Sequence, residues 1–297
     1  MVAPFAGFTT ATIASNQLVS SMPELPEVET MRTGIASVIG KKIRSVDFPR
    51  CKLKPILIHP GRAKLKRRLE GQKIVGTGRL GKRVVVELQS GDSVVFEPRM
   101  TGLVLVADPP NQTHLRLDIR LSKGKLLYWD RRGLGNVKVF DARELAAEFG
   151  PHRLGPDALT ATASQLEEKL GSSSREIKVA LLDQRAVAGI GNLYAAEILH
   201  LAGIHPQKRC KSMKKAAWKK VASATQKILS TAIKYEGSTL GDGTYRNALN
   251  QDGSYQNHHQ VYMRAGEKCL RCKSGSIRRI VQAQRSTFFC PKCQKKS

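Results

Sequence analysis

Residues 269–293 read CLRCKSGSIRRIVQAQRSTFFCPKC, with one Cys-x-x-Cys pair at each end of the stretch. Four thiolates at this spacing suit one tetrahedral zinc ion, and the segment between the pairs is long enough for a β-hairpin. A site closed by four thiolates has no open position, so we expect one structural Zn²⁺ held by Cys269, Cys272, Cys290 and Cys293. The hairpin then holds a basic tip near Arg285, or it simply covers the neighbouring domain.

The chain as a whole is strongly basic. Among its 297 residues, 50 Lys and Arg stand against 24 Asp and Glu, a formal net charge of +26. This excess is larger than solubility requires and indicates a polyanionic partner. There is no apolar run of transmembrane length and no basic amphipathic helix of the surface-binding kind, so we expect nucleic acid rather than a membrane. A basic surface without chemistry is the alternative that charge alone leaves open.

The first 21 residues differ from the rest, because MVAPFAGFTTATIASNQLVSS contains no charged residue. A secretory signal would need a basic region before a continuous apolar core, and a mitochondrial transit peptide would need arginines. Neither pattern is present. We expect residues 1–21 to be a non-native or disordered extension and Met22 to be the initiating methionine.

The segment after Met22 predicts an α+β architecture. Apolar residues recur at helical spacing over 26–39, which predicts one amphipathic helix. Strand-like segments follow, and turn pairs at 90–91 and 123–124 join two pairs of them into hairpins. These strands are expected over 73–75, 83–88, 93–97, 103–106, 115–121, 125–129 and 137–140. Many short strands beside a lone helix favour a β-sandwich.

The pattern then becomes helical, with helices expected over 162–170, 175–183, 192–202 and 214–235. The glycine-containing loop 185–191 separates the second helix from the third, as in a helix-turn-helix pattern. Glycines before a helix allow close approach of an anion, although such a loop is more often a packing turn. The stretch 237–260 is rich in Gly, Asn and Ser, and its length indicates either a functional lid or disorder.

The segment PELPEVET, residues 23–30, has two interpretations. If Met22 is removed, Pro23 has a free secondary amine, and an α-amino group titrates near neutrality and can act as a nucleophile. Its attack on a sugar C1′ would give an iminium ion that acidifies the C2′ proton, so base release and strand scission follow. Glu24 is placed to protonate the opening sugar and to shuttle protons. The alternative is that these prolines and acids only begin a helix.

Five motifs in order resemble the bacterial formamidopyrimidine-DNA glycosylases: PELPEVET, RLGK, RMTG, LLDQRAVAGIGNLYAAEILHLAGIHP and the cysteine-rich segment. The likeness extends from Pro23 to about Gln294. The resemblance implies a bifunctional enzyme that excises 8-oxoguanine and formamidopyrimidines and then cleaves the abasic site by β,δ-elimination. It also implies that Pro23 is the nucleophile, that Glu24 is the acid–base residue and that Glu27 lies near the reacting sugar.

The same resemblance implies how DNA is held. Lys82 of RLGK matches a strand lysine that contacts the phosphates flanking the lesion, Asn192 matches a phosphate-binding asparagine, and Arg285 matches the arginine of the zinc fingertip. A flipped nucleotide needs both flanking phosphates clamped while the duplex bends, so these roles are mutually consistent. Lys178 matches a lysine near the base pocket.

An extruded base leaves a hole that inserted side chains must fill. The family uses a methionine, an arginine and a phenylalanine, which correspond to Met100, Arg132 and Leu134. Leucine is still an apolar wedge, but it stacks less well on a base. Residues 97–99, Glu-Pro-Arg, also depart from the family's histidine and small residues. These departures bear on the choice of opposite base, whereas the chemistry is unaffected.

The expected organisation is an extension over 1–21, a catalytic β-sandwich domain with its helix over 22–152, a helix-two-turn-helix domain with a lesion-capping loop over 153–262, and a zinc finger over 263–297. The family implies no organic cofactor. It further implies a monomer that acts on double-stranded DNA containing oxidised bases or abasic sites, in the bacterial cytoplasm and at the nucleoid.

Two alternatives are a related enzyme branch and a protein of a different class. The endonuclease VIII branch removes oxidised pyrimidines with the same proline and zinc finger, but its opening usually departs from the ELPEVE that follows the proline here, and it lacks the long purine-capping loop, for which the segment over 238–256 is in the right location. A non-catalytic damaged-DNA-binding protein is the better interpretation if residues 1–21 stay attached, because an amide nitrogen at Pro23 cannot form the iminium.

Overall fold

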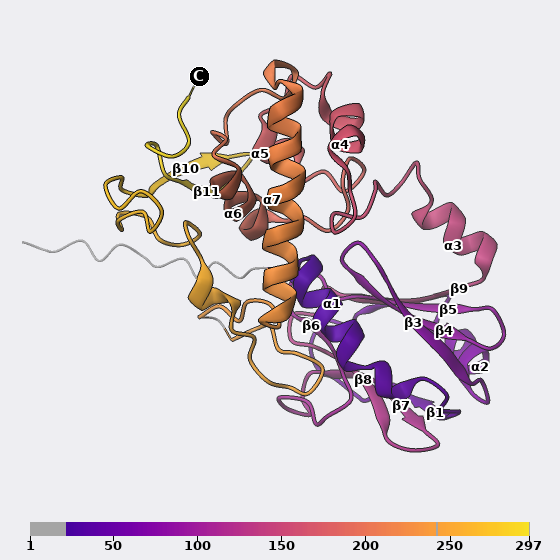
Figure 1. Cartoon of the computed structure of the whole chain (residues 1–297). Helices are drawn as coiled ribbons and strands as arrows, with labels where there is room; N and C mark the ends of the chain where they lie inside the picture. The colour runs from indigo at the N-terminus through magenta and orange to yellow at the C-terminus, as the bar shows by residue number, and fades with distance from the viewer. Residues whose placement is uncertain (1–21, 242, 297) are drawn as a thin grey trace, which may run out of the picture.

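The computed structural model describes residues 22–241 and 243–296, and the predicted extension over 1–21 lies outside them. Figure 1 shows a sheet-rich part below and a helical part above. The sheet-rich part has one four-stranded sheet, ordered β1-β7-β8-β6, and one five-stranded sheet, ordered β2-β9-β5-β4-β3. The strands are β1 Ile43–Asp47, β2 Leu57–His59, β3 Ile74–Leu80, β4 Arg83–Leu88, β5 Ser93–Glu97, β6 Gly102–Leu105, β7 Leu115–Leu121, β8 Lys125–Asp130 and β9 Asn136–Phe140.

The two sheets enclose a single apolar core. Val86 and Val94 from the larger sheet and Ile119 and Leu127 from the smaller one belong to one buried cluster. Val28 and other residues of helix α1, Leu25–Gly34, join the same cluster. Burying one face of each sheet against the other stabilises a sandwich, so the predicted β-sandwich with its helix is confirmed.

The helix content of this part was predicted incompletely. The helix expected over 26–39 ends as an α-helix at Gly34, and a 3₁₀ turn over Ala36–Val38 follows. The expectation of a lone helix was wrong, because α2, Arg62–Leu69, and α3, Ala142–Phe149, lie beside the sheets. Helix α2 is mostly basic and has only two buried apolar side chains, so its repeat is weak. Helix α3 has Leu145 and Phe149 at helical spacing, and these partly buried side chains pack against the outer face of the larger sheet, a signal that the sequence prediction did not use.

The position of Lys82 needs a correction. The strand expected over 73–75 is the beginning of β3, which continues to Leu80. Lys82 therefore lies in the turn between β3 and β4 rather than on a strand. A turn leaves the long side chain free of cross-strand neighbours, which suits a residue directed toward a ligand.

The helical part forms around a second core. Its helices are α4 Ala163–Leu170, α5 Ile177–Ala180, α6 Asn192–Ala202 and α7 Lys215–Lys234. Tyr194 of α6 and Trp218 of α7 are fully buried in this core. The helix expected over 175–183 shrinks to α5, because Glu176 makes an extended bridge with Arg209. Helix α6 ends at Gly203 in the left-handed conformation, φ +70°, a common helix stop.

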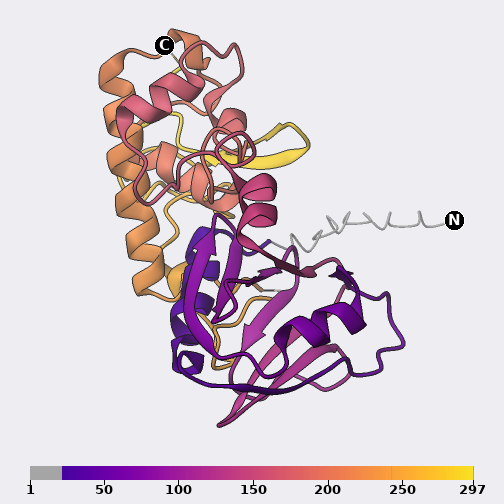
Figure 2. The ribbon, with the colours of Figure 1, turned by 90° about the vertical axis from the view of Figure 1, so that its right-hand side faces the viewer.

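The cysteine-rich segment forms the predicted hairpin. Strands β10, Arg278–Gln282, and β11, Arg285–Phe289, pair antiparallel between the two cysteine pairs. Ala283 and Gln284 form the turn with φ of 45° and 60°, so Arg285 stands directly after the tip. Figure 2 shows this yellow hairpin projecting to the right, on the side opposite the long orange helix α7.

The Gly-, Asn- and Ser-rich stretch over 237–260 packs back onto the sandwich in its described residues. Tyr245 and Ala248 belong to the sandwich core, and the Val106 N–H donates to the Ala248 carbonyl over 3.0 Å. A 3₁₀ turn, Tyr255–His258, closes the stretch. No helix among the described residues is both long and apolar enough to cross a membrane.

Candidate active site

A cavity of about 940 Å³ lies where the sandwich, the helical part and the β10–β11 hairpin meet. Pro23, Lys82, Asn192 and Arg285 line it together, although they are far apart in the sequence. Its lining is mainly positive, since two carboxylates, Glu24 and Glu97, stand against six basic side chains. These are Lys82, Arg83, Arg99, Arg132, Arg279 and Arg285. A cleft of this sign concentrates a polyanion.

Glu24 connects the cavity to the first turn of α6. It is 4% exposed, and its carboxylate accepts hydrogen bonds from the backbone N–H groups of Gly191 over 2.6 Å and Leu193 over 2.9 Å. A carboxylate is stabilised by the free N–H groups and the dipole of a helix N-terminus. Glu24 thus contacts a helix 167 positions away, which the interpretation of PELPEVET as a simple helix start does not explain.

Burial raises the pKa of Glu24 from 4.5 to about 7, against the lowering effects of Lys82 and the two N–H groups. Removing a carboxylate from water disfavours its charged form, and here this effect is larger than the stabilisation by nearby positive groups. A carboxyl group with a pKa near 7 can both give and take a proton at neutral pH. Glu24 is therefore suited to acid–base chemistry beside Pro23.

Glu27 lies behind Glu24 and is not among the residues that line the cavity. Its carboxylate accepts from the Tyr194 hydroxyl over 2.6 Å, from the Ser238 N–H over 2.9 Å and from the Glu24 N–H over 3.0 Å. Burial raises its pKa. Glu27 thereby joins the start of α1, helix α6 and the base of the loop over 238–256.

Two lysines near the cavity have lowered pKa values. Burial lowers the pKa of Lys82, partly offset by Glu24 and Glu27. Burial, together with the positive charge of Arg285, lowers the pKa of Lys178 from 10.5 to about 8. Lys178 is fully buried and is absent from the cavity lining, so the structure places it beneath the surface that Arg285 and Asn192 form.

Asn192 holds the helical part and the hairpin together. Its side-chain oxygen accepts from Lys178 Nζ over 2.5 Å, and its side-chain nitrogen donates to the Ser286 carbonyl over 3.0 Å. Both amide ends are thus fixed at the first residue of α6. This brings the N-terminus of α6 beside β11, which begins at Arg285. The free N–H groups of the helix and the Arg285 guanidinium can then hold one anion between them.

The three predicted hole-filling residues are placed differently. Met100 and Arg132 line the cavity, whereas Leu134 is 37% exposed and does not. The loop that carries Arg132 and Leu134 is held by the fully buried Asp130. The Asp130 carboxylate accepts from the Thr101 hydroxyl, from the Arg132 N–H over 3.1 Å and from the Gly135 N–H over 2.8 Å.

Thr101 directly follows Met100, and its hydroxyl oxygen also accepts from the Arg132 N–H over 3.0 Å. The Asp130–Thr101 pair therefore ties the Met100 segment to the loop over 131–135. Side chains that must enter a duplex together gain from such preorganisation, because less conformational freedom is lost when they bind.

The four cysteines fit a single zinc ion. The Sγ atoms of Cys269, Cys272, Cys290 and Cys293 all lie within 4.8 Å of one another. The Sγ–Sγ distances are 3.8 Å between Cys269 and Cys293 and 3.7 Å between Cys272 and Cys290. A Zn–S bond of about 2.3 Å in a tetrahedron requires about 3.8 Å between sulfurs. The set is closed, so zinc held by it stabilises the hairpin and has no position for substrate.

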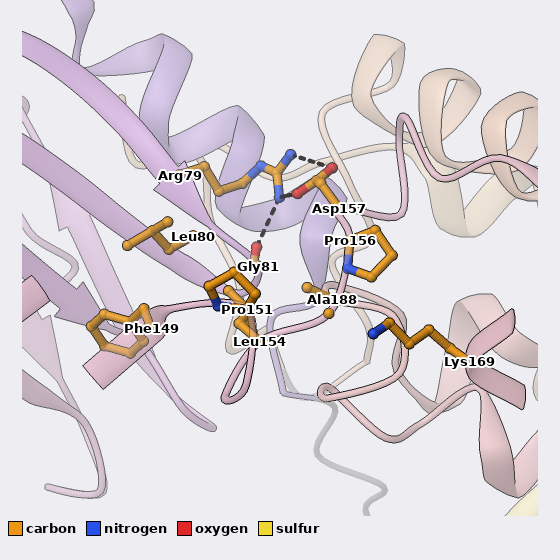
Figure 3. Close-up of a pocket in the computed structure, with 11 residues that line it drawn as sticks. Arg79, Leu80, Gly81, Phe149, Pro151, Leu154, Pro156, Asp157, Lys169 and Ala188 are labelled. Atoms are coloured by element: carbon orange, nitrogen blue, oxygen red, sulfur yellow. Dashed lines mark hydrogen bonds and ion pairs between the residues drawn. The ribbon is translucent and has the colours of Figure 1, made fainter. Parts of the chain in front are cut away.

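A smaller cavity of about 440 Å³ lies at the boundary between the two parts (Figure 3). Arg79 of β3 makes two hydrogen bonds to Asp157, of 2.6 and 3.0 Å, and its Nε donates to Glu29 of α1 over 2.8 Å. Arg79 also donates to the Gly81 carbonyl over 3.0 Å, directly before Lys82. The ion pair fixes the Lys82 turn against the helical part.

Several residues of the site were not found from the sequence. Gly191 is one of them. It belongs to the site because any side chain there would collide with Glu24: a Cβ atom would lie 2.5 Å from Oε1 of Glu24. Its place before Asn192 in the GIGN motif was a usable signal of close backbone approach. Asp130, Thr101 and Tyr194 act through contacts that only the folded chain brings together, so no local pattern marks them.

Family models match three consecutive regions of the chain. They are the formamidopyrimidine-DNA glycosylase N-terminal domain over residues 22–137, the formamidopyrimidine-DNA glycosylase H2TH domain over 154–243 and the "zinc finger found in FPG and IleRS" over 266–296. The chain belongs to the formamidopyrimidine-DNA glycosylase family, as its motifs predicted.

Curated relatives agree over nearly the whole length. The formamidopyrimidine-DNA glycosylase of Chloroflexus aggregans is 37% identical over 284 residues, which cover 92% of this chain and 98% of that one. The Lactococcus lactis subsp. cremoris enzyme is 36% identical over 283 residues, 93% of this chain and 100% of that one.

Solved structures show the same fold. The Lactococcus lactis enzyme in complex with abasic-site DNA superposes with a TM-score of 0.82 at 34% identity, covering 92% of this chain and 100% of that chain. A variant of that enzyme bound to DNA containing a formamidopyrimidine lesion gives a TM-score of 0.83 at 35% identity, with the same coverage.

Proposed function

We propose that this chain is a bifunctional DNA glycosylase and abasic-site lyase that removes oxidised purines, 8-oxoguanine and formamidopyrimidines, with Pro23 as its nucleophile. The observation that carries the proposal is the juxtaposition of Pro23 and the buried Glu24 in a positive cavity. Family membership and the relatives' names agree with it. The DNA complexes of the Lactococcus enzyme support double-stranded damaged DNA as the partner.

The chemistry follows from one secondary amine. The Pro23 nitrogen bonds to C1′ of the damaged nucleotide while the bond from C1′ to the base breaks; the base leaves with the electron pair and takes up the proton that the Pro23 nitrogen loses. Glu24 donates a proton to the ring oxygen as the sugar opens, and an iminium ion forms. The iminium acidifies the C2′ proton, which passes to the Glu24 carboxylate as the 3′ phosphate leaves, and a second elimination, with loss of the C4′ proton, expels the 5′ phosphate. Water then releases the enzyme.

The mechanism requires a free amine at Pro23, because an amide lone pair is delocalised and cannot attack C1′. The active form must therefore begin at Pro23, without the residues that precede it in the sequence. The family model begins its match at residue 22, which is consistent with this requirement.

The remaining site residues are assigned to DNA contacts. Lys82, Asn192 and Arg285 clamp the phosphates beside the flipped nucleotide, and their convergence on one cavity supports this role. Met100 and Arg132 enter the vacated stack, and Leu134 follows as the duplex bends. Glu27 and Lys178 support the site from below. We further propose a monomer that acts at the nucleoid in the bacterial cytoplasm.

Borohydride trapping tests the nucleophile. A protein that begins at Pro23 is incubated with an 8-oxoguanine duplex and borohydride, which reduces the iminium to a stable bond between protein and DNA. The covalent complex is quantified on a denaturing gel. We expect efficient trapping by this form and none by a matched form in which residues 1–22 remain attached. Equal trapping by both forms, or by neither, contradicts the role of Pro23.

A second substrate class has one observation in its favour, since a Lactococcus lactis enzyme of 35% identity was solved with DNA containing an oxidised pyrimidine. Single-turnover excision of 8-oxoguanine and of an oxidised pyrimidine from otherwise identical duplexes separates the two. Faster purine excision supports the proposal, whereas faster pyrimidine excision supports the alternative.

A further inference from the structure

The outer face of α7 has a positive charge that the proposed reaction does not use. Between Ile198 and Tyr235 the sequence contains no Asp or Glu, while lysines and arginines recur from Lys208 to Lys234. Helix α7 buries Trp218, Ile228 and other apolar residues against the helical core. Its lysines therefore gather on the opposite, solvent-exposed side.

Four of these lysines form the basic face: Lys219, Lys220, Lys227 and Lys234. All four are exposed, and among the described residues none forms an ion pair with a carboxylate. Lys220, Lys227 and Lys234 follow a seven-residue spacing, so they lie nearly in line, about 10 Å apart along the axis. The basic face is a straight, uncompensated row of charge.

Acidic side chains on neighbouring segments form no ion pair with this row among the described residues. Helix α4 packs beside α7 and carries Glu167 and Glu168. Glu168 lies 4.0 Å from Lys169 of its own helix. Glu236, just past the end of α7, accepts a hydrogen bond from Asn247 over 3.0 Å.

The basic face is directed away from the active-site cavity. In Figure 2 the orange helix α7 forms the left edge of the molecule, while the yellow β10–β11 hairpin, which contributes to the cavity, projects to the right. The core of the helical part, including Tyr194 of α6, fills the space between them. A duplex held in the cavity therefore leaves the basic face free.

We propose that the basic face of α7 is a second, sequence-independent binding surface for duplex DNA, which holds another DNA segment while the cavity engages a lesion. The backbone of a duplex carries about one negative charge per 1.7 Å of its axis, so a straight row of cations gains by releasing its counterions. Exposed lysines act as point charges without the planar fork of arginine, which suits phosphate contact without sequence selection.

A membrane fits this surface less well. Helices that lie in a bilayer interface insert their apolar face, and the apolar face of α7 is committed to the protein core. An acidic protein partner would be expected to bury apolar anchors as well, and the exposed side of α7 presents lysine, serine, glutamine and alanine. Duplex DNA can bind through attraction between its phosphates and the lysines, without apolar contacts.

The test counts duplexes bound per protein. A short undamaged duplex is titrated into the full chain at low salt, and stoichiometry is measured by sedimentation. The test variant carries Lys219→Gln, Lys220→Gln, Lys227→Gln and Lys234→Gln. The matched control neutralises four exposed cations of the sandwich, Lys64→Gln, Arg67→Gln, Lys73→Gln and Lys123→Gln.

We expect two duplexes per chain for the unaltered protein and the control, and one for the α7 variant. Single-turnover excision from a short lesion duplex should stay within about twofold in both variants, because neither set lies at the cavity. One duplex per chain for the unaltered protein, or equal stoichiometry in the two variants, overturns the proposal. Binding of the same proteins to phosphatidylserine vesicles is measured in parallel. If the α7 variant loses vesicle binding but keeps the second duplex, the proposal is overturned in favour of a membrane. Stoichiometry does not depend on catalysis, so failure of the proposed function gives a separate result.

Discussion

Replacing Asp130 by asparagine tests how the loop with Arg132 and Leu134 is held. One Asp130 oxygen accepts from Thr101 and from the Arg132 N–H, and the other accepts from the Gly135 N–H over 2.8 Å. Asparagine can keep its single oxygen toward Thr101, but its amino group then faces the Gly135 N–H, donor against donor. The loss of one hydrogen bond to a buried carboxylate costs about 1.5–3 kcal/mol.

This energy is the amount by which the substitution shifts the equilibrium of the loop from its ordered toward its disordered state. If excision needs the ordered loop, the Asp130→Asn variant should lose roughly 10- to 100-fold in kcat/KM on an 8-oxoguanine duplex. The amount of zinc bound by the four cysteines should be unchanged. The assay is steady-state excision, together with thermal melting and zinc content.

Thr101→Ser is the matched control, because serine keeps the hydroxyl that donates to Asp130 and accepts from Arg132. It should retain nearly full activity, whereas Thr101→Val should lose activity as Asp130→Asn does. A kcat/KM within twofold of the parent for Asp130→Asn, with an unchanged melting temperature, would refute the idea that this carboxylate orders the loop.

Three further predictions address the cavity and the metal site. Gly191→Ala should lower the rate of single-turnover excision with little change in fold, because its Cβ would lie 2.5 Å from Oε1 of Glu24 and displace that carboxylate. Gly191→Ser should be at least as slow as Gly191→Ala in the same assay. Excision should fall as pH rises through about 7, since the raised pKa of Glu24 leaves its acid form present only below that value, and Glu24→Gln should remove this limb of the pH–rate profile. Removal of zinc by a chelator should abolish binding of lesion DNA and lower the melting temperature, and added zinc should restore both; retained binding in the metal-free protein contradicts a role in holding the hairpin.

The parts of the fold that the sequence predicted are those with a short-range physical cause. Paired thiolates at fixed spacing define the hairpin between Cys272 and Cys290, and its strands are found where they were expected. Strands β4 and β5 are marked by short runs of β-branched residues, because Val86 and Val94 face the sandwich core while Val85 and Val95 are buried on the other face of the sheet. Helix α2 was missed because its sequence is mostly basic, and only Leu65 and Leu69 reach the core.

The site was predicted in its residue types rather than its geometry. The motif by itself left Pro23 and Glu24 open between an active site and a helix start, and the resemblance to the family decided in favour of the active site. It did not reveal that the Glu24 carboxylate rests on Gly191 and Leu193, since this contact depends on how two separately formed cores dock. Leu134 shows the same limit. The sequence assigned it to the wedge position by its place in the motif, but only the structure shows that its side chain is exposed.

The docking of the two cores couples the acid strength of Glu24 to the shape of the cavity. Its pKa is raised mainly by burial, and the N–H groups of α6 and the nearby Lys82 oppose that rise. The Arg79–Asp157 ion pair fixes the Lys82 turn against the helical part, and so fixes one of these opposing charges. Greater access of water to Glu24 would lower its pKa toward the ordinary value of 4.5. Burial between the two parts therefore favours the protonated carboxyl near neutral pH, which suits proton donation within the assembled site.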